Sequence, residues 1–137
     1  MKATRKPWRV SFYRFPAYWE ELVEAFLLPE DVVSRLEALR LELASSVGGY
    51  PTVYVTDRQG EMIHVCMTPK SWILIVHTST GECRVTTSNK ATSETCAFLF
   101  PEWTELSKRH LIPKATARKV LVHWLETGEP SSLVHWE

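Results

Sequence analysis

Histidine and cysteine are the residues of this chain that could most readily bind a metal ion. The chain has five histidines and three cysteines, Cys66, Cys83 and Cys96. No two cysteines are separated by two residues, and no histidine pair has the helical spacing and neighbouring glutamate of a metalloenzyme motif. His64 and Cys66 share a face of an expected strand, but two ligands do not complete a site. The sequence therefore predicts no metal site, and we expect all three cysteines to be buried free thiols.

The carboxylates show no recognisable catalytic arrangement. A serine nucleophile needs a base that a carboxylate orients, yet the chain has only two aspartates and no glycine-bracketed serine. Glu102 and Glu105 could serve as an acid–base pair, but their spacing is more typical of a solvated edge. The five glycines form no phosphate-binding pattern. We therefore expect no catalytic residue, no cofactor and no enzyme activity.

The overall charge excludes further classes of protein. The 137 residues carry 16 basic and 16 acidic side chains, so the formal net charge is zero. A neutral balance argues against direct nucleic-acid binding, because such domains are usually basic, and it argues equally against an acidic mimic of nucleic acid. No apolar run reaches the ~20 residues of a membrane helix, and no signal-peptide core follows the basic N-terminus. We expect a cytoplasmic protein that does not insert into a membrane.

Residues 17–45 have the apolar periodicity of helices. A first helix is expected before Pro29, with an apolar face of Trp19, Leu22, Val23, Phe26 and Leu27 and an acidic face of Glu20, Glu21 and Glu24. A second helix is expected after Pro29, with a seam of Val32, Leu36, Leu39 and Leu43, ending at Gly48-Gly49. A third helix is predicted over residues 113–127, with Pro113 as its first residue and Gly128 closing it.

The remainder of the chain alternates in the manner of β-strands. Strands are expected at residues 8–15, 51–56, 61–67, 71–77, 82–87, 95–100 and 132–136, with an exposed polar loop from Thr86 to Thr95. Residues 72–76 are apolar throughout, which is typical of a central strand that is covered on both faces. Together these elements predict a single α+β domain over residues 1–137, with a mostly antiparallel sheet and helices packed on it.

Several motifs carry a resemblance to a known family. The C-terminal segment runs from Leu111-Ile112-Pro113 through a helix with Ala117 and Trp124 to Leu125-Glu126-Thr127-Gly128-Glu129-Pro130 and Leu133-Val134-His135-Trp136-Glu137. It resembles the closing signature of the first-numbered immunity protein family of bacterial polymorphic toxin systems. Gly48-Gly49-Tyr50-Pro51 resembles the strand entry of that family, and the stretch from Trp103 to Pro113 resembles its approach to the last helix. The resemblance covers about residues 45–137.

This resemblance implies a small α+β domain that binds a cognate toxin protein and blocks it. Family members are paired with several toxin types, prominently nucleic-acid-targeting ones such as deaminases. The resemblance implies neither catalysis nor a cofactor, and it does not fix an oligomeric state. The six tryptophans leave an alternative open, namely a small ligand-binding or enzymatic α+β domain with a tryptophan-rich pocket. A structural subunit of a larger complex is a third interpretation.

An inhibitor must reach its target with exposed groups, and a basic toxin cleft is best matched by acidic groups beside an aromatic anchor. Glu102, Trp103 and Glu105 are therefore the first candidates for toxin binding. Asp57 and Glu61, at the expected hairpin turn, are the second, and the polar loop around Ser88-Asn89-Lys90 offers a further exposed segment. The acidic face of Glu20, Glu21 and Glu24 is the rival surface.

Overall fold

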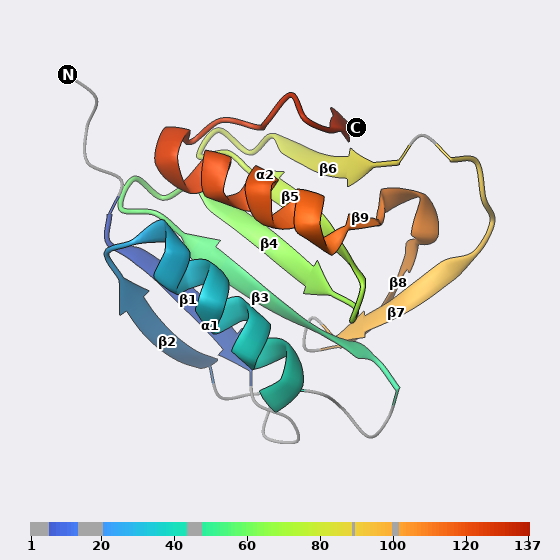
Figure 1. Cartoon of the computed structure of the whole chain (residues 1–137), viewed down its shortest axis with the longest axis horizontal. Coiled ribbons are helices and arrows are strands. Elements are labelled where there is room, and N and C mark those ends of the chain that lie inside the picture. The colour runs from blue at the N-terminus through green and yellow to red at the C-terminus, as the bar shows by residue number, and fades with distance from the viewer. Residues whose placement is uncertain (1–5, 14–20, 44–47, 89, 100–101) are drawn as a thin grey trace.

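The computed structural model describes residues 6–13, 21–43, 48–88, 90–99 and 102–137 (Figure 1). In chain order the elements are β1 (Trp8–Tyr13), β2 (Glu21–Phe26), α1 (Pro29–Glu42), β3 (Tyr50–Thr56), β4 (Met62–Met67), β5 (Ser71–His77), β6 (Cys83–Thr87), β7 (Thr95–Leu99), β8 (Trp103–Ser107), η1 (Lys108–His110), β9 (Ile112–Pro113), α2 (Lys114–Thr127) and β10 (His135–Trp136).

Antiparallel pairing dominates the sheet. Its main path runs in the order β10-β6-β5-β4-β3-β1-β2. β7 is the exception, because it pairs in parallel with β3 at Tyr50 and Pro51 and then antiparallel with β8. The fold is therefore α+β with a mostly antiparallel sheet, as the sequence predicts.

Helices α1 and α2 cover one face of this sheet and bury the larger core (Figure 1). The predicted seam of α1 is buried at Val32, Leu36, Leu39 and Leu43. The α2 seam is buried at Ala117, Val120, Leu121, Trp124 and Leu125. Alternate side chains of the central strands meet these seams, including Val10, Val55, Val65, Trp72 and Leu74. The two helices are thus positioned by apolar burial, the main favourable term in folding.

The hairpin of β7 and β8 covers part of the opposite face. Cys96 and Phe98 of β7 pack on Cys66 and Ile73 of the sheet, with Leu106 of β8 against the same cluster. β5 is consequently buried from both sides, and Trp72, Ile73 and Leu74 have no exposed surface. Residues 71–77 thus form the predicted central strand, but its second face is covered only in part, because Ile75 and His77 are partly buried.

The helix predicted before Pro29 is wrong, because residues 21–26 form strand β2. They pair antiparallel with β1, with Phe12 opposite Leu22 and Trp8 opposite Phe26. The segment also fits a period of two, since Leu22, Glu24 and Phe26 face α1 while Glu21, Val23 and Ala25 face away. Pairing with β1 favours the period of two over the helical one. Trp19 and Glu20 lie outside the described residues, and Glu21 and Glu24 do not share a face.

Three smaller expectations also need correction. Cys83 is exposed, whereas Cys66 and Cys96 are buried as predicted. Thr86 and Thr87 are buried in β6 rather than exposed in a loop, because their hydroxyls bond to the backbone around η1. Pro113 is the N-cap of α2 and not its first residue. The other end of α2 is as predicted, with Gly128 in the left-handed conformation at φ 78°.

Trp124 tests the packing of α2. Its side chain is fully buried in the core under the helices. Replacing it (Trp124→Ala) should lower the free energy of unfolding by roughly 3–5 kcal/mol, since truncation of a buried aromatic leaves a cavity. Urea denaturation followed by circular dichroism measures the change. Trp103→Ala, at an exposed tryptophan, is the control and should change little. Equal effects of the two substitutions would contradict this assignment of the core.

Candidate functional site

The outer surface of the β7–β8 hairpin carries two of the predicted binding residues, Trp103 and Glu105, and Glu102 is exposed directly before β8. Trp103 lies opposite Leu99 and Glu105 lies opposite Ala97 in the antiparallel register. Because Cys96, Phe98 and Leu106 face the sheet, the alternate positions Trp103 and Glu105 point away from it. The hairpin is therefore fixed by its inner face and presents its outer face to solvent.

Trp103 is the aromatic centre of this outer face. It is 55% exposed, which is unusual for so large an apolar side chain, and Leu99 lies directly across the ladder from it. Glu102 and Glu105 are both exposed beside it. The Glu105 carboxylate accepts a hydrogen bond from Thr95 Oγ1 at 3.3 Å. We call Glu102, Trp103 and Glu105 the hairpin patch.

Asp57 and Glu61 lie elsewhere, at the turn between β3 and β4. The hairpin patch adjoins the start of β3 through β7, whereas this turn follows the end of β3. Asp57 is only 8% exposed, and its carboxylate accepts hydrogen bonds from the backbone N–H groups of Gln59 at 2.8 Å and Glu61 at 2.9 Å. The Asp57 side chain thus shapes the turn. A role of Asp57 and Glu61 in binding stays a prediction, separate from the hairpin patch.

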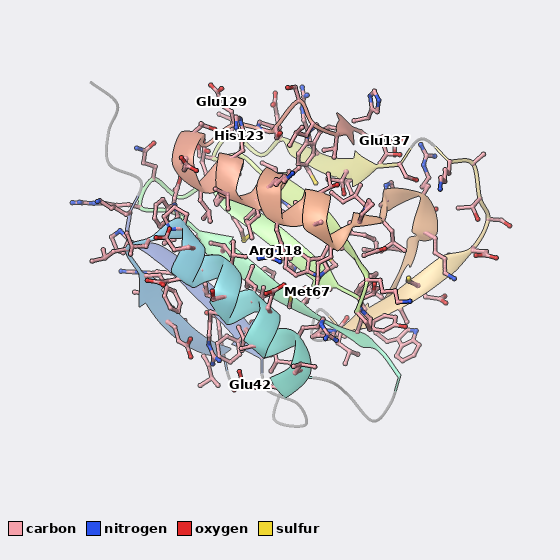
Figure 2. The ribbon with its side chains drawn as sticks, in the orientation of Figure 1. Glu42, Met67, Arg118, His123, Glu129 and Glu137 are labelled. Carbon is pink, nitrogen blue, oxygen red and sulfur yellow. The ribbon has the colours of Figure 1, made fainter. Side chains whose placement is uncertain are left out.

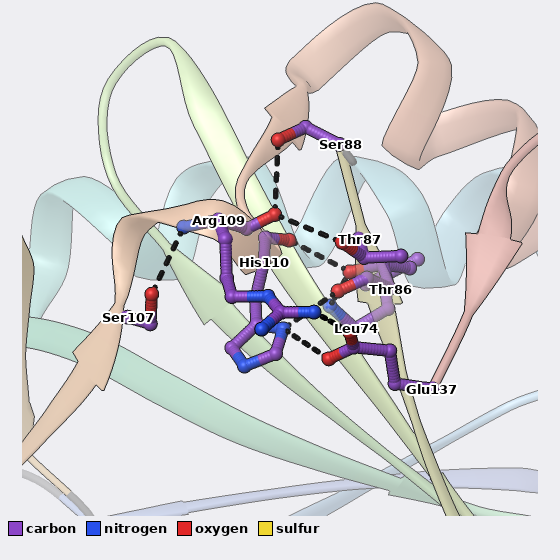
Figure 3. Close-up of polar contacts among 8 residues, drawn as sticks. All are labelled: Leu74, Thr86, Thr87, Ser88, Ser107, Arg109, His110 and Glu137. Atoms are coloured by element: carbon purple, nitrogen blue, oxygen red, sulfur yellow. Dashed lines mark hydrogen bonds and ion pairs between the residues drawn. The ribbon is translucent and has the colours of Figure 1, made fainter. Parts of the chain in front are cut away.

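A polar cluster ties β6 to η1 and to the C-terminal strand (Figure 3). Thr86 Oγ1 donates a hydrogen bond to the backbone oxygen of His110 at 2.9 Å, and His110 Nδ1 lies 3.1 Å from the backbone oxygen of Thr86. Arg109 forms an ion pair with Glu137, whose backbone exchanges two hydrogen bonds with Val85. These groups bind one another, so the cluster stabilises the attachment of β10 and is not a reactive site.

A row of rings crosses the sheet face that the helices leave open. Tyr13 of β1 contacts Tyr54 of β3 edge-on, with ring centroids 6.5 Å apart. Tyr54 lies 4.0 Å from the ring of His64 on β4, and His64 lies 6.3 Å from His77 on β5. Sequence reasoning missed this row, although the alternation of each strand predicts which face these residues share once the pairing is known.

Burial governs the protonation of the two histidines in this row. Desolvation, with a smaller contribution from the nearby His77, lowers the pKa of His64 from 6.5 to about 3. Desolvation also lowers the pKa of His77. Both rings are therefore neutral near pH 7, and the row is an uncharged aromatic surface.

The helical face carries a shallow groove between α1 and α2, with a volume of about 560 Å³. Val33 of α1 and Val122 of α2 are among its apolar lining residues. Arg118 lies between the two helices (Figure 2), where it forms an ion pair with Glu37 at 3.4 Å. This groove contains neither a paired acid and base nor a set of metal ligands.

The described residues contain no group of three or more histidine, cysteine, aspartate or glutamate side chains that could hold a metal ion. Burial raises the pKa of the Cys66 thiol well above its usual range, so this thiol stays protonated and unreactive. No helix in the described part of the chain is long and apolar enough to cross a membrane.

The family described as "Immunity protein Imm1" matches residues 29–137. The chain belongs to the Imm1 family. No curated protein and no solved structure matches the chain. The Imm1 match begins at the start of α1, upstream of the resemblance expected from about residue 45, and includes the whole β7–β8 hairpin. β1 and β2 lie outside the matched residues.

His64 gives this Imm1 protein a measurable acid sensitivity. Its pKa is about 3 in the folded chain and 6.5 for the exposed group, so between these values only the unfolded chain binds the proton. Protonation of His64 in the unfolded chain therefore leaves the free energy of unfolding unchanged above pH 6.5. As the pH falls from 6.5 toward 3, it lowers the free energy of unfolding by up to about 1.4 kcal/mol per pH unit. We expect the His64 ring to stay neutral at pH 5 in an NMR titration. Protonation near pH 6.5 would contradict the burial described above.

Proposed function

We propose that this protein is an immunity protein that binds a cognate toxin domain and neutralises it stoichiometrically, without catalytic turnover. The match of the Imm1 family over residues 29–137 carries this proposal. Exposed groups on a rigid support, with no metal cluster among the described residues, are in keeping with an inhibitor that acts by contact.

The hairpin patch is the surface that we propose for toxin contact. Interfaces are commonly dominated by an aromatic anchor near their centre, with polar groups around it. Trp103 has this position, because it is exposed between Glu102 and Glu105 on a hairpin whose inner face is packed. A packed support keeps the cost of ordering these side chains low when the partner binds.

We further propose that the toxin acts on nucleic acid, as a deaminase or a nuclease does. Enzymes of this kind need a basic surface to hold phosphates. Glu102 and Glu105 offer local negative charge to such a surface, although the whole chain is neutral. The complementarity would then be confined to the contact area and would not extend over the molecule.

The alternative of a tryptophan-rich ligand pocket has little support from the structure. Trp8, Trp72 and Trp124 are buried in the core, so their rings cannot line an accessible pocket. Trp103 is exposed on the opposite side of the sheet from these three. Trp136 is half-buried against the same core and donates a hydrogen bond to the backbone oxygen of Ser131, so the tryptophans described do not line one accessible pocket.

Charge reversal tests the acidic part of the hairpin patch. Glu102→Lys with Glu105→Lys should weaken binding of the cognate toxin domain by roughly tenfold or more, because opposite charges become like charges. Isothermal titration measures the affinity, and thermal unfolding should be almost unchanged because exposed charges contribute little to stability.

The matched control for this pair is Glu126→Lys with Glu129→Lys, at two exposed glutamates around the end of α2. It makes the same change of net charge far from the hairpin in the sequence. Equal loss in both double variants would point to long-range charge, and loss only in the control would place the interface on the helical face. If a toxin domain is encoded beside this gene and the protein does not bind it, the proposed function itself is overturned.

Trp103→Ala tests the aromatic anchor separately from charge. If Trp103 is the centre of the interface, its removal should cost at least about 2 kcal/mol of binding free energy, or roughly 30-fold in affinity. Leu133→Ala, at another exposed apolar residue, is the comparison and should bind as the parent does. An unchanged affinity of Trp103→Ala would remove the hairpin patch from the interface.

A further inference from the structure

Strand β2 forms one end of the sheet, and among the residues described no strand pairs with its outer edge (Figure 1). A free edge presents unpaired backbone groups, which proteins protect with lysine, proline or a very short strand. β10, at the other end of the main path of the sheet, has only two residues. β2 has six residues and contains neither lysine nor proline.

The two glutamates of β2 are already engaged within the chain. Glu24 forms an ion pair with Arg35 of α1, with Nε–Oε1 and Nη2–Oε2 distances of 2.6 and 2.9 Å. Glu21 accepts a hydrogen bond from the hydroxyl of Tyr13 at 3.1 Å. The charge of Glu24 is therefore compensated by α1, whereas Glu21, whose partner is an uncharged hydroxyl, keeps its charge on the open face.

Exposed apolar side chains accompany this edge. Val23 is 52% exposed at the middle of β2, and Leu27 and Leu28 are exposed directly after its end. Apolar groups that gather along an unpaired strand are typical of an interaction surface. We propose that two copies of this chain associate through β2, which pairs antiparallel with the β2 of its partner about a twofold axis at Val23.

The register follows from geometry and charge. In an antiparallel pair of strands, residues that lie opposite each other point to the same face of the sheet. A twofold axis normal to the sheet therefore lies between the two strands and sets one residue directly opposite its own copy. An axis at Glu24 would set Glu24 against its own copy, which is repulsive. An axis at Leu22 would pair only three residues of the strand. The axis at Val23 pairs five, with Glu21 opposite Ala25 and Leu22 opposite Glu24.

Charge complementarity favours the same register. On the open face Tyr13 is the neighbour of Glu21, and the exposed Arg9 is the neighbour of Ala25. In the dimer, Glu21 of one copy is therefore separated from Arg9 of the other by Ala25 alone. Two strand spacings, ~10 Å, divide their backbones, and the two long side chains can meet above the small alanine. The twofold axis forms this pair twice.

Sedimentation equilibrium of the full chain is the first test. We expect twice the 15.8 kDa mass of one chain in the micromolar range. Val23→Lys should give the mass of one chain, because it sets two ammonium groups against each other on the axis. Leu41→Lys, at a leucine on α1 that is 66% exposed, should remain a dimer. A monomeric parent, or a Val23→Lys variant that stays dimeric, overturns the proposal.

A disulfide tests the register directly. Residues opposite each other in antiparallel strands have Cα atoms ~4.5–5.5 Å apart, which a disulfide can bridge. In a Cys83→Ser background, which removes the exposed native thiol, Val23→Cys should cross-link under mild oxidation and Leu41→Cys should not. Cross-linking of Leu41→Cys without cross-linking of Val23→Cys overturns the arrangement.

A charge swap provides a third measurement that does not touch the axis. Arg9→Glu should raise the dimer dissociation constant about tenfold, because each of the two Arg9–Glu21 pairs across the interface then becomes a pair of carboxylates. Adding Glu21→Arg should restore the parent value, whereas a purely structural role of Arg9 would give no rescue. The absence of both loss and rescue overturns the pairing. These tests use this chain alone, so their outcome is independent of the proposed toxin binding.

Discussion

The burial of one sheet face under two helices is the interaction on which the rest of the structure depends. Trp72 and Trp124 both belong to this core and are inaccessible to solvent. Because side chains alternate along each strand, packing one face under α1 and α2 leaves the other residues of every strand on a second face. The second face is then free to acquire a different cover, which the β7–β8 hairpin provides only in part.

In the β7–β8 hairpin, different residues serve stability and contact with a partner. The inner residues of the hairpin, such as Phe98, are fixed by the core beneath them. The outer residues, such as Trp103 and Glu105, contribute little to that core and can be chosen for a partner. A hairpin therefore offers a rigid support and an unconstrained contact surface at alternate positions of the same strands.

Local apolar periodicity predicted correctly those elements whose packing in the folded protein follows the same periodicity. α1 and α2 follow their apolar seams, and the hairpin of β3 and β4 follows its turn residues. β2 could not be assigned in this way, because its apolar residues fit both a helix and a strand, and only the distant pairing with β1 decides. The exposed Glu105 was found from charge and neighbouring aromaticity, whereas the burial of Asp57 depends on backbone bonds within its turn.

Strands β1 and β2, which lie outside the residues matched by the family, form one end of the sheet. The matched residues begin at α1, yet Val10 and Phe12 of β1 are buried in the core that α1 and α2 share with the matched strands. β1 is thus held by packing on its helical side. Leu22 and Phe26 of β2 pack on the same core, whereas the residues of β1 and β2 on the open side are held mainly by strand pairing, which constrains side chains less than packing does. Substitutions on that side therefore change the outer surface of the sheet while the common core keeps its shape.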